Sequence, residues 1–189
     1  MVLKFNNSNQ ISDFPFFKKR LIEAIGIILC IFSFILTLSL FSFTPNDPSF
    51  SNLTDSKVQN LVGTHGAYAS DALLNLFGVG SIMIILISIA WGGQLFFKKK
   101  ISFFWVRLIF MPITIVCSAI ALDSIILDDS WPLDAGAGGI IGKYISIFIV
   151  NFFNDINFYI SKIYISFFFS FLTLFSLNIS IGFSQEDWL

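Results

Sequence analysis

Charged residues are scarce in this sequence: they make up 12% of the chain, whereas soluble domains carry roughly a quarter. A soluble domain could bury the hydrophobic residues, which make up 56%, but its surface could not be so poor in Lys, Arg, Asp and Glu. The shortage of charge therefore excludes an ordinary soluble domain and indicates an integral membrane protein. The net charge of −1 likewise lacks the basic surface expected of a nucleic-acid-binding domain.

Cysteine and histidine are also rare. Cys30 and Cys117 both lie in apolar runs, so we expect them to pack as free thiols rather than form a disulfide or a metal site. His65 is the only histidine, and no second metal ligand stands beside it. No pair of residues has a spacing typical of a catalytic site. We therefore expect no catalytic, cofactor-binding or metal-binding residues in this chain.

The sequence has no recognisable cleavable signal peptide, because residues 1–20 are polar and mixed and the first apolar run is too long for one. Four apolar runs are each long enough to cross the hydrocarbon as a helix, which takes about 20 residues. We predict an all-α integral membrane protein with four transmembrane helices. The predicted spans are residues 21–43, 72–97, 101–122 and 163–183.

Lysine and arginine gather near the ends of the predicted spans, and short loops rich in these residues stay on the cytoplasmic side of a bilayer. We therefore expect both termini to be cytoplasmic, with residues 1–20 as a tail and residues 184–189 as the start of a linker. The loops 44–71 and 123–162 are then outside. Arg107 lies within a span and is expected to extend its side chain back to the cytoplasmic surface. The residues predicted to set the topology are Lys18, Lys19, Arg20, Lys98, Lys99, Lys100 and Arg107.

The second outer loop is acidic, with Asp123, Asp128, Asp129 and Asp134 and neither Lys nor Arg among them. Two interpretations are open: a divalent-cation site, or negative charge that only reflects topology and solvation. The spacing does not match an EF-hand, which favours the second interpretation.

The glycine-rich run 136–143 ends in Gly-Lys and so has to be compared with a phosphate-binding loop. That motif needs four residues between its glycines and a Ser or Thr after the Lys, but here Tyr144 follows Lys143 and neither candidate glycine pair has that spacing. We expect instead a flexible turn that permits close backbone approach. Polar residues then recur at helical spacing as far as about Ser161, which predicts an amphipathic helix at the outer membrane interface, before the last span.

Three segments of the predicted outer regions carry motifs. Residues 42–49 read Ser-Phe-Thr-Pro-Asn-Asp-Pro-Ser, residues 63–78 begin Gly-Thr-His-Gly-Ala, and residues 135–142 are rich in glycine. Together they resemble the membrane-anchoring N-terminal domain of bacterial FtsK-type DNA translocases, in which the first segment usually has Tyr and Ser where Phe43 and Thr44 stand here. The motif residues are Pro45, Asp47, Pro48, Ser49, Gly63, Gly66, Asp71, Gly136, Gly138, Gly139 and Gly142.

This resemblance implies a membrane anchor that positions a DNA-translocating motor at the septum, in cell division and chromosome segregation. It also implies the bacterial inner membrane, a homo-oligomer that is a hexamer, and contacts with other cell-division membrane proteins as well as the lipid bilayer. No motor residue occurs in the 189 residues. DNA, ATP and Mg are therefore expected to concern only a motor outside this chain, and the chain itself is not expected to be an enzyme.

A small polytopic transporter or channel subunit is the alternative. The acidic outer loop and Pro112, within the third predicted span, are its support. Transport sites commonly place an ionisable residue in the middle of a span, and the predicted spans have no central Asp, Glu, Lys or His. The sequence therefore favours the anchor.

Overall fold

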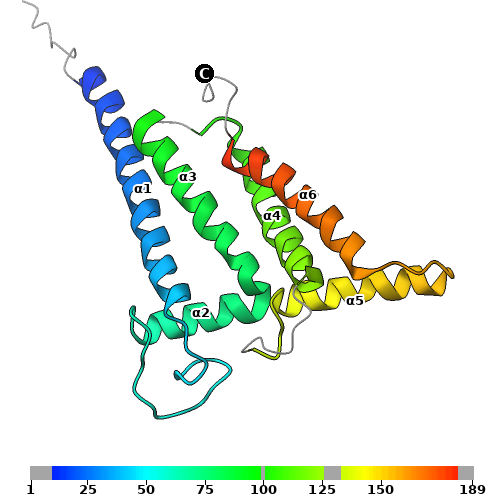
Figure 1. Cartoon of the computed structure of the whole chain (residues 1–189). Coiled ribbons are helices and arrows are strands. Elements are labelled where there is room, and N and C mark those ends of the chain that lie inside the picture. Colours follow the sequence, from blue (N-terminus) through cyan, green and yellow to red (C-terminus); the bar gives the residue numbers. More distant parts are fainter. Residues whose placement is uncertain (1–9, 99–100, 126–132, 183–189) are drawn as a thin grey trace, which may run out of the picture.

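The computed structural model describes residues 10–98, 101–125 and 133–182, and the regular elements among these residues are all helical (Figure 1). Four stretches are long and apolar enough to cross a membrane, and this confirms the predicted fold class. The stretches are residues 16–41, 64–97, 104–125 and 162–181. The elements are α1 (Gln10–Phe41), α2 (Thr64–Phe77), the 3-10 turn η1 (Gly78–Ser81), α3 (Ile82–Lys98), α4 (Phe104–Ile125), α5 (Gly139–Asp155) and α6 (Lys162–Ile181).

The second predicted span differs most from the structure. A single helix over 72–97 is wrong, because helix begins already at Thr64 and is interrupted by η1. Gly78 stands at the interruption with φ of 58°, a left-handed conformation that costs other residues about 1–2 kcal/mol. Hydropathy could not reveal this bend, since it depends on the backbone conformation at Gly78 and not on apolar composition. α2 therefore runs across the ends of the spans, and α3 makes the crossing (Figure 1).

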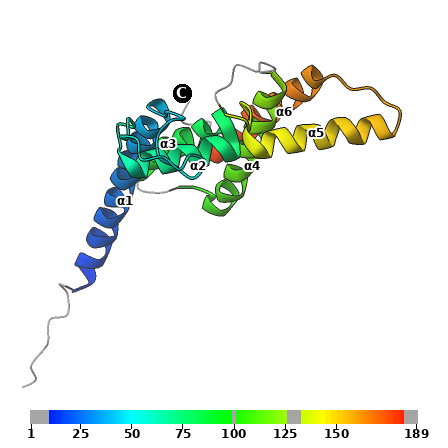
Figure 2. The same cartoon turned by 90° about the horizontal axis from the view of Figure 1, so that it is seen from below.

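The spans form two pairs, α1 with α3 and α4 with α6, and the pairs touch each other only sparsely along their lengths. The start of α1 and the end of α6 lie at the same end of the molecule, here called the terminal end (Figure 1). At the opposite end, here called the loop end, α2 and α5 meet nearly end to end when viewed from below (Figure 2). The two pairs are thus joined mainly at the two ends of the molecule.

Small and hydroxylic side chains fill the contacts within the pairs. A Cβ added at Gly26 would lie 2.8 Å from the carbonyl oxygen of Gly92, so these glycines let α1 and α3 approach closely. The Ser33 hydroxyl donates to the carbonyl of Ile85 at 2.9 Å within the same pair. In the other pair, the Thr114 and Ser176 hydroxyls are 3.0 Å apart. Both cysteines are free, as predicted.

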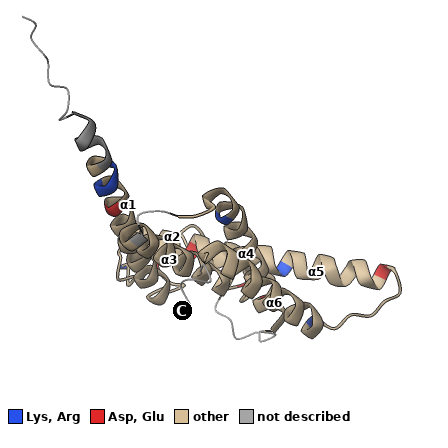
Figure 3. Cartoon of the chain, turned by 90° about the horizontal axis from the view of Figure 1, so that it is seen from above, with Lys and Arg blue, Asp and Glu red and all other residues tan. Residues whose placement is uncertain are grey.

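The outward faces of the spans are strongly apolar. Figure 3 shows that charged residues are sparse along the helices, with basic segments near the start of α1. Large aromatic side chains are exposed instead, which suits contact with lipid rather than water. On α6 the exposed rings are Tyr164, Phe167, Phe168, Phe171 and Phe175.

Candidate functional site

The loop between α1 and α2 is built around the buried carboxylate of Asp47, which is 2% exposed. Its two oxygens accept hydrogen bonds from the backbone N–H groups of Gln59 at 2.8 Å and Asn60 at 2.9 Å. The Asn60 side-chain amide in turn donates to the carbonyl of Ser39 at 2.8 Å. Because a buried carboxylate is costly unless it is hydrogen-bonded, Asp47 folds the loop back on itself and Asn60 ties it to α1.

Asp71 fastens the same loop to α2. Its carboxylate is 1% exposed and accepts from the Ser51 backbone N–H at 3.0 Å, from the Ser51 hydroxyl, and from the Asn75 amide at 2.8 Å. Gly66 is close to the same structure, since an added Cβ would lie 2.2 Å from the Asn60 amide oxygen. The motif residues Asp47, Gly66 and Asp71 are therefore brought together around one loop.

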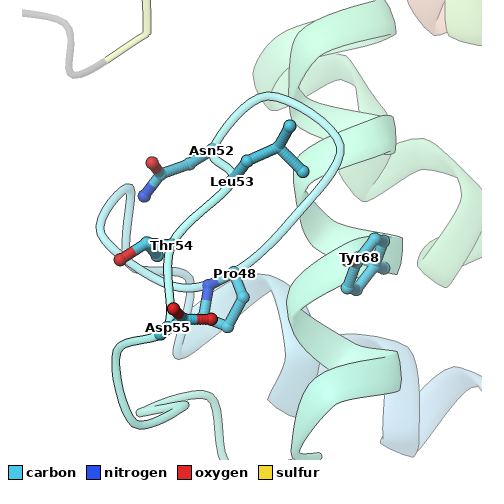
Figure 4. A pocket seen from close by; sticks show the side chains of 6 residues that line it. All are labelled: Pro48, Asn52, Leu53, Thr54, Asp55 and Tyr68. Carbon is cyan, nitrogen blue, oxygen red and sulfur yellow. The ribbon is translucent and has the colours of Figure 1, made fainter.

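The remaining motif residues of this loop shape its surface. The carbonyl of Pro45 accepts a hydrogen bond from the Asn52 amide at 3.0 Å, and Ser49 is buried. Gly63 has φ of 74° at the start of α2, with open space around its α-carbon. A shallow cavity of about 300 Å³ lies between the loop and α2 (Figure 4). It is lined by Pro48, Asn52, Leu53, Thr54, Asp55 and Tyr68.

The loop presents apolar side chains beyond the spans. Leu53 is 93% exposed and Phe50 is 73% exposed, although the Phe50 ring also meets Tyr68 edge to face at 4.8 Å. Since Asp47 and Asp71 hold the loop backbone in place, the surface that the loop presents is preorganised.

The glycine-rich turn packs backbone to backbone against the break between α2 and α3. The N–H of Val79 donates to the carbonyl of Ala137 at 2.8 Å. A Cβ added at Gly78 would lie 1.9 Å from the same carbonyl oxygen, and one added at Gly139 would lie 2.5 Å from the nitrogen of Gly78. The predicted close backbone approach is confirmed here, but the predicted turn over 136–143 is wrong in its second half, because α5 begins at Gly139.

The same turn also packs on α4. A Cβ added at Gly138 or Gly142 would lie 2.3 Å or 2.5 Å from the carbonyl oxygen of Ala119. Gly136 adopts φ of 77° in the turn itself. The glycine-rich segment, the break at η1 and α4 thus form one contact, here called the glycine junction. It has no room for a side chain at Gly78, Gly138, Gly139 or Gly142.

Asp123 lies beside the glycine junction, where it accepts a hydrogen bond from the buried hydroxyl of Ser146 on α5. Asp134 is exposed, and its carbonyl accepts from the Lys143 ammonium at 3.0 Å. Asp128 and Asp129 lie outside the described residues. Among residues 10–98, 101–125 and 133–182, no three His, Cys, Asp or Glu side chains are grouped as metal ligands.

Arg107 occupies the terminal end of the interface between the pairs, and it is 6% exposed. Its guanidinium donates to the carbonyls of Ile181 at 3.2 Å and Gly182 at 3.1 Å, and also to the side-chain oxygen of Gln94. These contacts hold the side chain at the terminal end of the protein, and its extension to the cytoplasmic surface remains a prediction. The end of α6 offers unpaired carbonyls and the negative end of the helix dipole, and these replace water as its partners.

Two further side chains complete this cluster. The Gln94 amide donates to the carbonyl of Ile181 at 2.5 Å, and the Trp91 indole donates to that of Ser180 at 2.8 Å. We call Trp91, Gln94 and Arg107 the terminal clamp. Sequence reasoning missed the roles of Trp91 and Gln94. An arginine within a span and a glycine after the last apolar helix were the available signals, but nothing in the sequence indicated that they meet.

The other predicted topology-setting residues are only partly described. Lys18, Lys19 and Arg20 are exposed on α1, and Arg20 forms an ion pair with Glu23 at 2.7 Å. Lys98 ends α3, whereas Lys99, Lys100 and the linker residues 184–189 lie outside the described residues. Their effect on topology remains a prediction.

The amphipathic helix predicted as far as about Ser161 ends earlier. α5 stops at Asp155, and Asn157 adopts φ of 56°, which takes the chain out of the helix. Ser146 points into the protein, whereas Phe148 is 69% exposed. The location of α5 at the outer membrane interface remains a prediction.

Comparison with known proteins gives one family and several relatives. Residues 18–187 match the family model described as the 4TM region of DNA translocase FtsK/SpoIIIE. The chain is 33% identical over 131 residues to a DNA translocase FtsK of Rickettsia prowazekii. The aligned residues cover 69% of this chain and 17% of the relative. The corresponding protein of Rickettsia typhi is 32% identical over 129 residues, covering 68% of this chain and 17% of the relative. No solved structure matches the chain significantly.

Proposed function

Because this chain belongs to the family of 4TM regions of FtsK/SpoIIIE DNA translocases, we propose that it anchors a cytoplasmic DNA-translocating motor in a bacterial inner membrane at the division septum. The chain is the multi-pass membrane domain of such a protein, and the matched part spans about a sixth of the length of its curated relatives. ATP, Mg and DNA belong to the motor. The membrane domain itself performs no catalysis and serves in cell division and chromosome partition.

The observation that carries this proposal is the arrangement of the helix ends. α1 begins and α6 ends at the same end of the molecule, which also holds the exposed basic residues of α1 (Figure 1). The positive-inside rule assigns that end to the cytoplasm. A segment that follows α6 would then begin on the side of the membrane where DNA and ATP are found.

The loop end provides the proposed contacts with other division proteins. The loop held by Asp47 and Asp71 presents Leu53, Phe50 and Asp55 beyond the spans. α5, with exposed aromatic side chains, lies in the outer lipid interface in this proposal. The domain assembles as a homo-oligomer, with six copies if it follows its family.

Reporter fusions at four positions test the proposed topology. A reporter fused after Lys100 or Leu189 is expected to be active only if it is of a type that works in the cytoplasm. A reporter fused after Asp55 or Asp129 is expected to be active only if it is of a type that works outside. An outside signal at Leu189 would contradict the anchor. A fluorescent fusion of the chain should also gather at the septum, whereas uniform membrane fluorescence would contradict the septal part of the proposal.

A further inference from the structure

The last turn of α6 is held by other helices rather than by its own backbone alone. The carbonyls of Ser180, Ile181 and Gly182 all accept hydrogen bonds from the terminal clamp. Trp91 and Gln94 belong to α3, and Arg107 belongs to α4. Two neighbouring helices therefore grip the point at which the last span ends.

Hydrogen bonds from neighbouring helices are favourable here because a helix end leaves its last four carbonyls without intrahelical partners. Within a membrane, water cannot readily replace those partners. The backbone supplies one bond of its own, from the Gly182 N–H to the carbonyl of Asn178 at 2.9 Å. The clamp supplies partners for the carbonyls of Ser180, Ile181 and Gly182, and its positive charge lies at the negative end of the α6 dipole.

Gly182 fits the clamp closely. It adopts φ of 65°, and a Cβ added there would lie 2.0 Å from the Cζ atom of Arg107. A side chain at this position would therefore displace the guanidinium. Helix α5 ends differently: the N–H groups of Asn157 and Phe158 donate to the carbonyls of Asn154 and Phe153, both at 2.9 Å. A grip by neighbouring helices is thus not a general feature of helix ends in this protein.

We propose that Arg107, with Gln94 and Trp91, keeps the last turn of α6 folded when the chain beyond it is pulled. This inference rests on the proposed function, in which a motor that pulls on DNA follows the last span. Tension on the chain beyond Gly182 would otherwise unravel the last turn of α6, since terminal turns have few bonds to lose. The terminal clamp passes that tension to α3 and α4, and through α3 to α1, against which α3 packs.

Single-molecule pulling on the 189-residue chain in bicelles tests this inference. Magnetic tweezers hold the chain by tags at its two ends. The wild-type domain is expected to stay folded under increasing force until whole helices unfold together. In Arg107→Gln the last turn of α6 should open first. Its lifetime at constant force should fall by about tenfold or more, because hydrogen bonds to charged groups are among the strongest.

Ser166→Ala is the matched control. Ser166 lies at the other end of α6, where its buried hydroxyl donates to the carbonyl of Ala121 at 3.1 Å. This change should lower the general stability of the domain but leave the first opening step of α6 unaltered. Equal shortening of that step in both variants would reduce Arg107 to an ordinary stabilising residue, and no shortening in Arg107→Gln would overturn the inference outright.

Milder variants keep the test decisive if Arg107→Gln fails to insert. Trp91→Phe retains the ring but loses the donor to Ser180, and Gln94→Ala removes the donor to Ile181. Both should shorten the lifetime of the last turn, and unchanged lifetimes in both would overturn the inference. Arg107→Lys should be intermediate, since an ammonium keeps the charge but cannot fork between two carbonyls. Pulling does not depend on which side Leu189 occupies, so failure of the proposed topology is detected separately by the reporter fusions.

Discussion

At the scale of single residues, buried carboxylates organise the loop that the domain presents at its loop end. Asp47 and Asp71 are both almost completely buried, and their partners are backbone N–H groups, a hydroxyl and an amide. The family motif identified both residues from the sequence. Their partners could not be predicted, because Gln59 and Ser51 lie 12 and 20 residues away through a loop without periodicity.

Replacing Asp47 by Ala should loosen this loop. The N–H groups of Gln59 and Asn60 would lose their acceptor, and leaving the buried Asn60 N–H unsatisfied costs about 1–3 kcal/mol of local stability. Hydrogen exchange should show faster exchange at Gln59 and Asn60. Asp55→Ala removes an exposed carboxylate from the same loop and should leave both rates unchanged. Equal protection in wild type and Asp47→Ala would mean that the carboxylate does not hold the loop.

At the scale of elements, glycines decide where helices meet and where one is broken. The four apolar runs could be found by hydropathy. The break at η1 and the crossing of Gly26 with Gly92 could not be found in the same way. Both depend on which backbone lies opposite, and apolar composition does not encode that.

Two adjacent glycines on α3 provide a matched comparison. A Cβ at Gly92 would lie 2.6 Å from the sulfur of Cys30, whereas one at Gly93 would meet nothing within 4 Å. Gly92→Ala should therefore destabilise the α1–α3 pair by about 1–3 kcal/mol through overpacking. Gly93→Ala should be neutral or slightly stabilising, because Ala favours helix. Unfolding of the purified protein in mixed micelles of rising SDS content measures both, and equal midpoints would contradict the close crossing.

At the scale of the whole molecule, the domain consists of two helix pairs joined at both ends and sparsely in between. The number of spans and the shared side of the helix ends could be predicted from sequence. The pairing could not, because its polar contacts link residues as distant as Thr114 and Ser176, which are 62 positions apart. The contact of Arg107 with the end of α6 was likewise invisible in the sequence, since Ile181 lies 74 residues away.

Cutting the chain between the pairs tests this architecture. Separately expressed residues 1–99 and 100–189 should co-purify from the membrane, because the glycine junction and the terminal clamp both bridge the two pieces. Gly78→Ala should weaken this association, since its Cβ would strike the carbonyl of Ala137 and leave only the terminal clamp to bridge the pieces. Gly93→Ala should not weaken it. Co-purification of Gly78→Ala in the same yield as the wild type would show that the glycine junction does not join the pairs.

The length of α1 has a consequence for how the domain sits in lipid. Its 32 residues extend about 48 Å at 1.5 Å per residue, more than the roughly 30 Å of the hydrocarbon layer. Successive helical residues are 100° apart, so Lys18, Lys19 and Arg20 point in three directions around the rod. They form a collar rather than a patch. Such a collar resists sliding of α1 along the membrane normal, because each charge can contact the lipid headgroups only at one depth. The collar does not fix the rotation of α1 about its own axis, which is set by packing against α3.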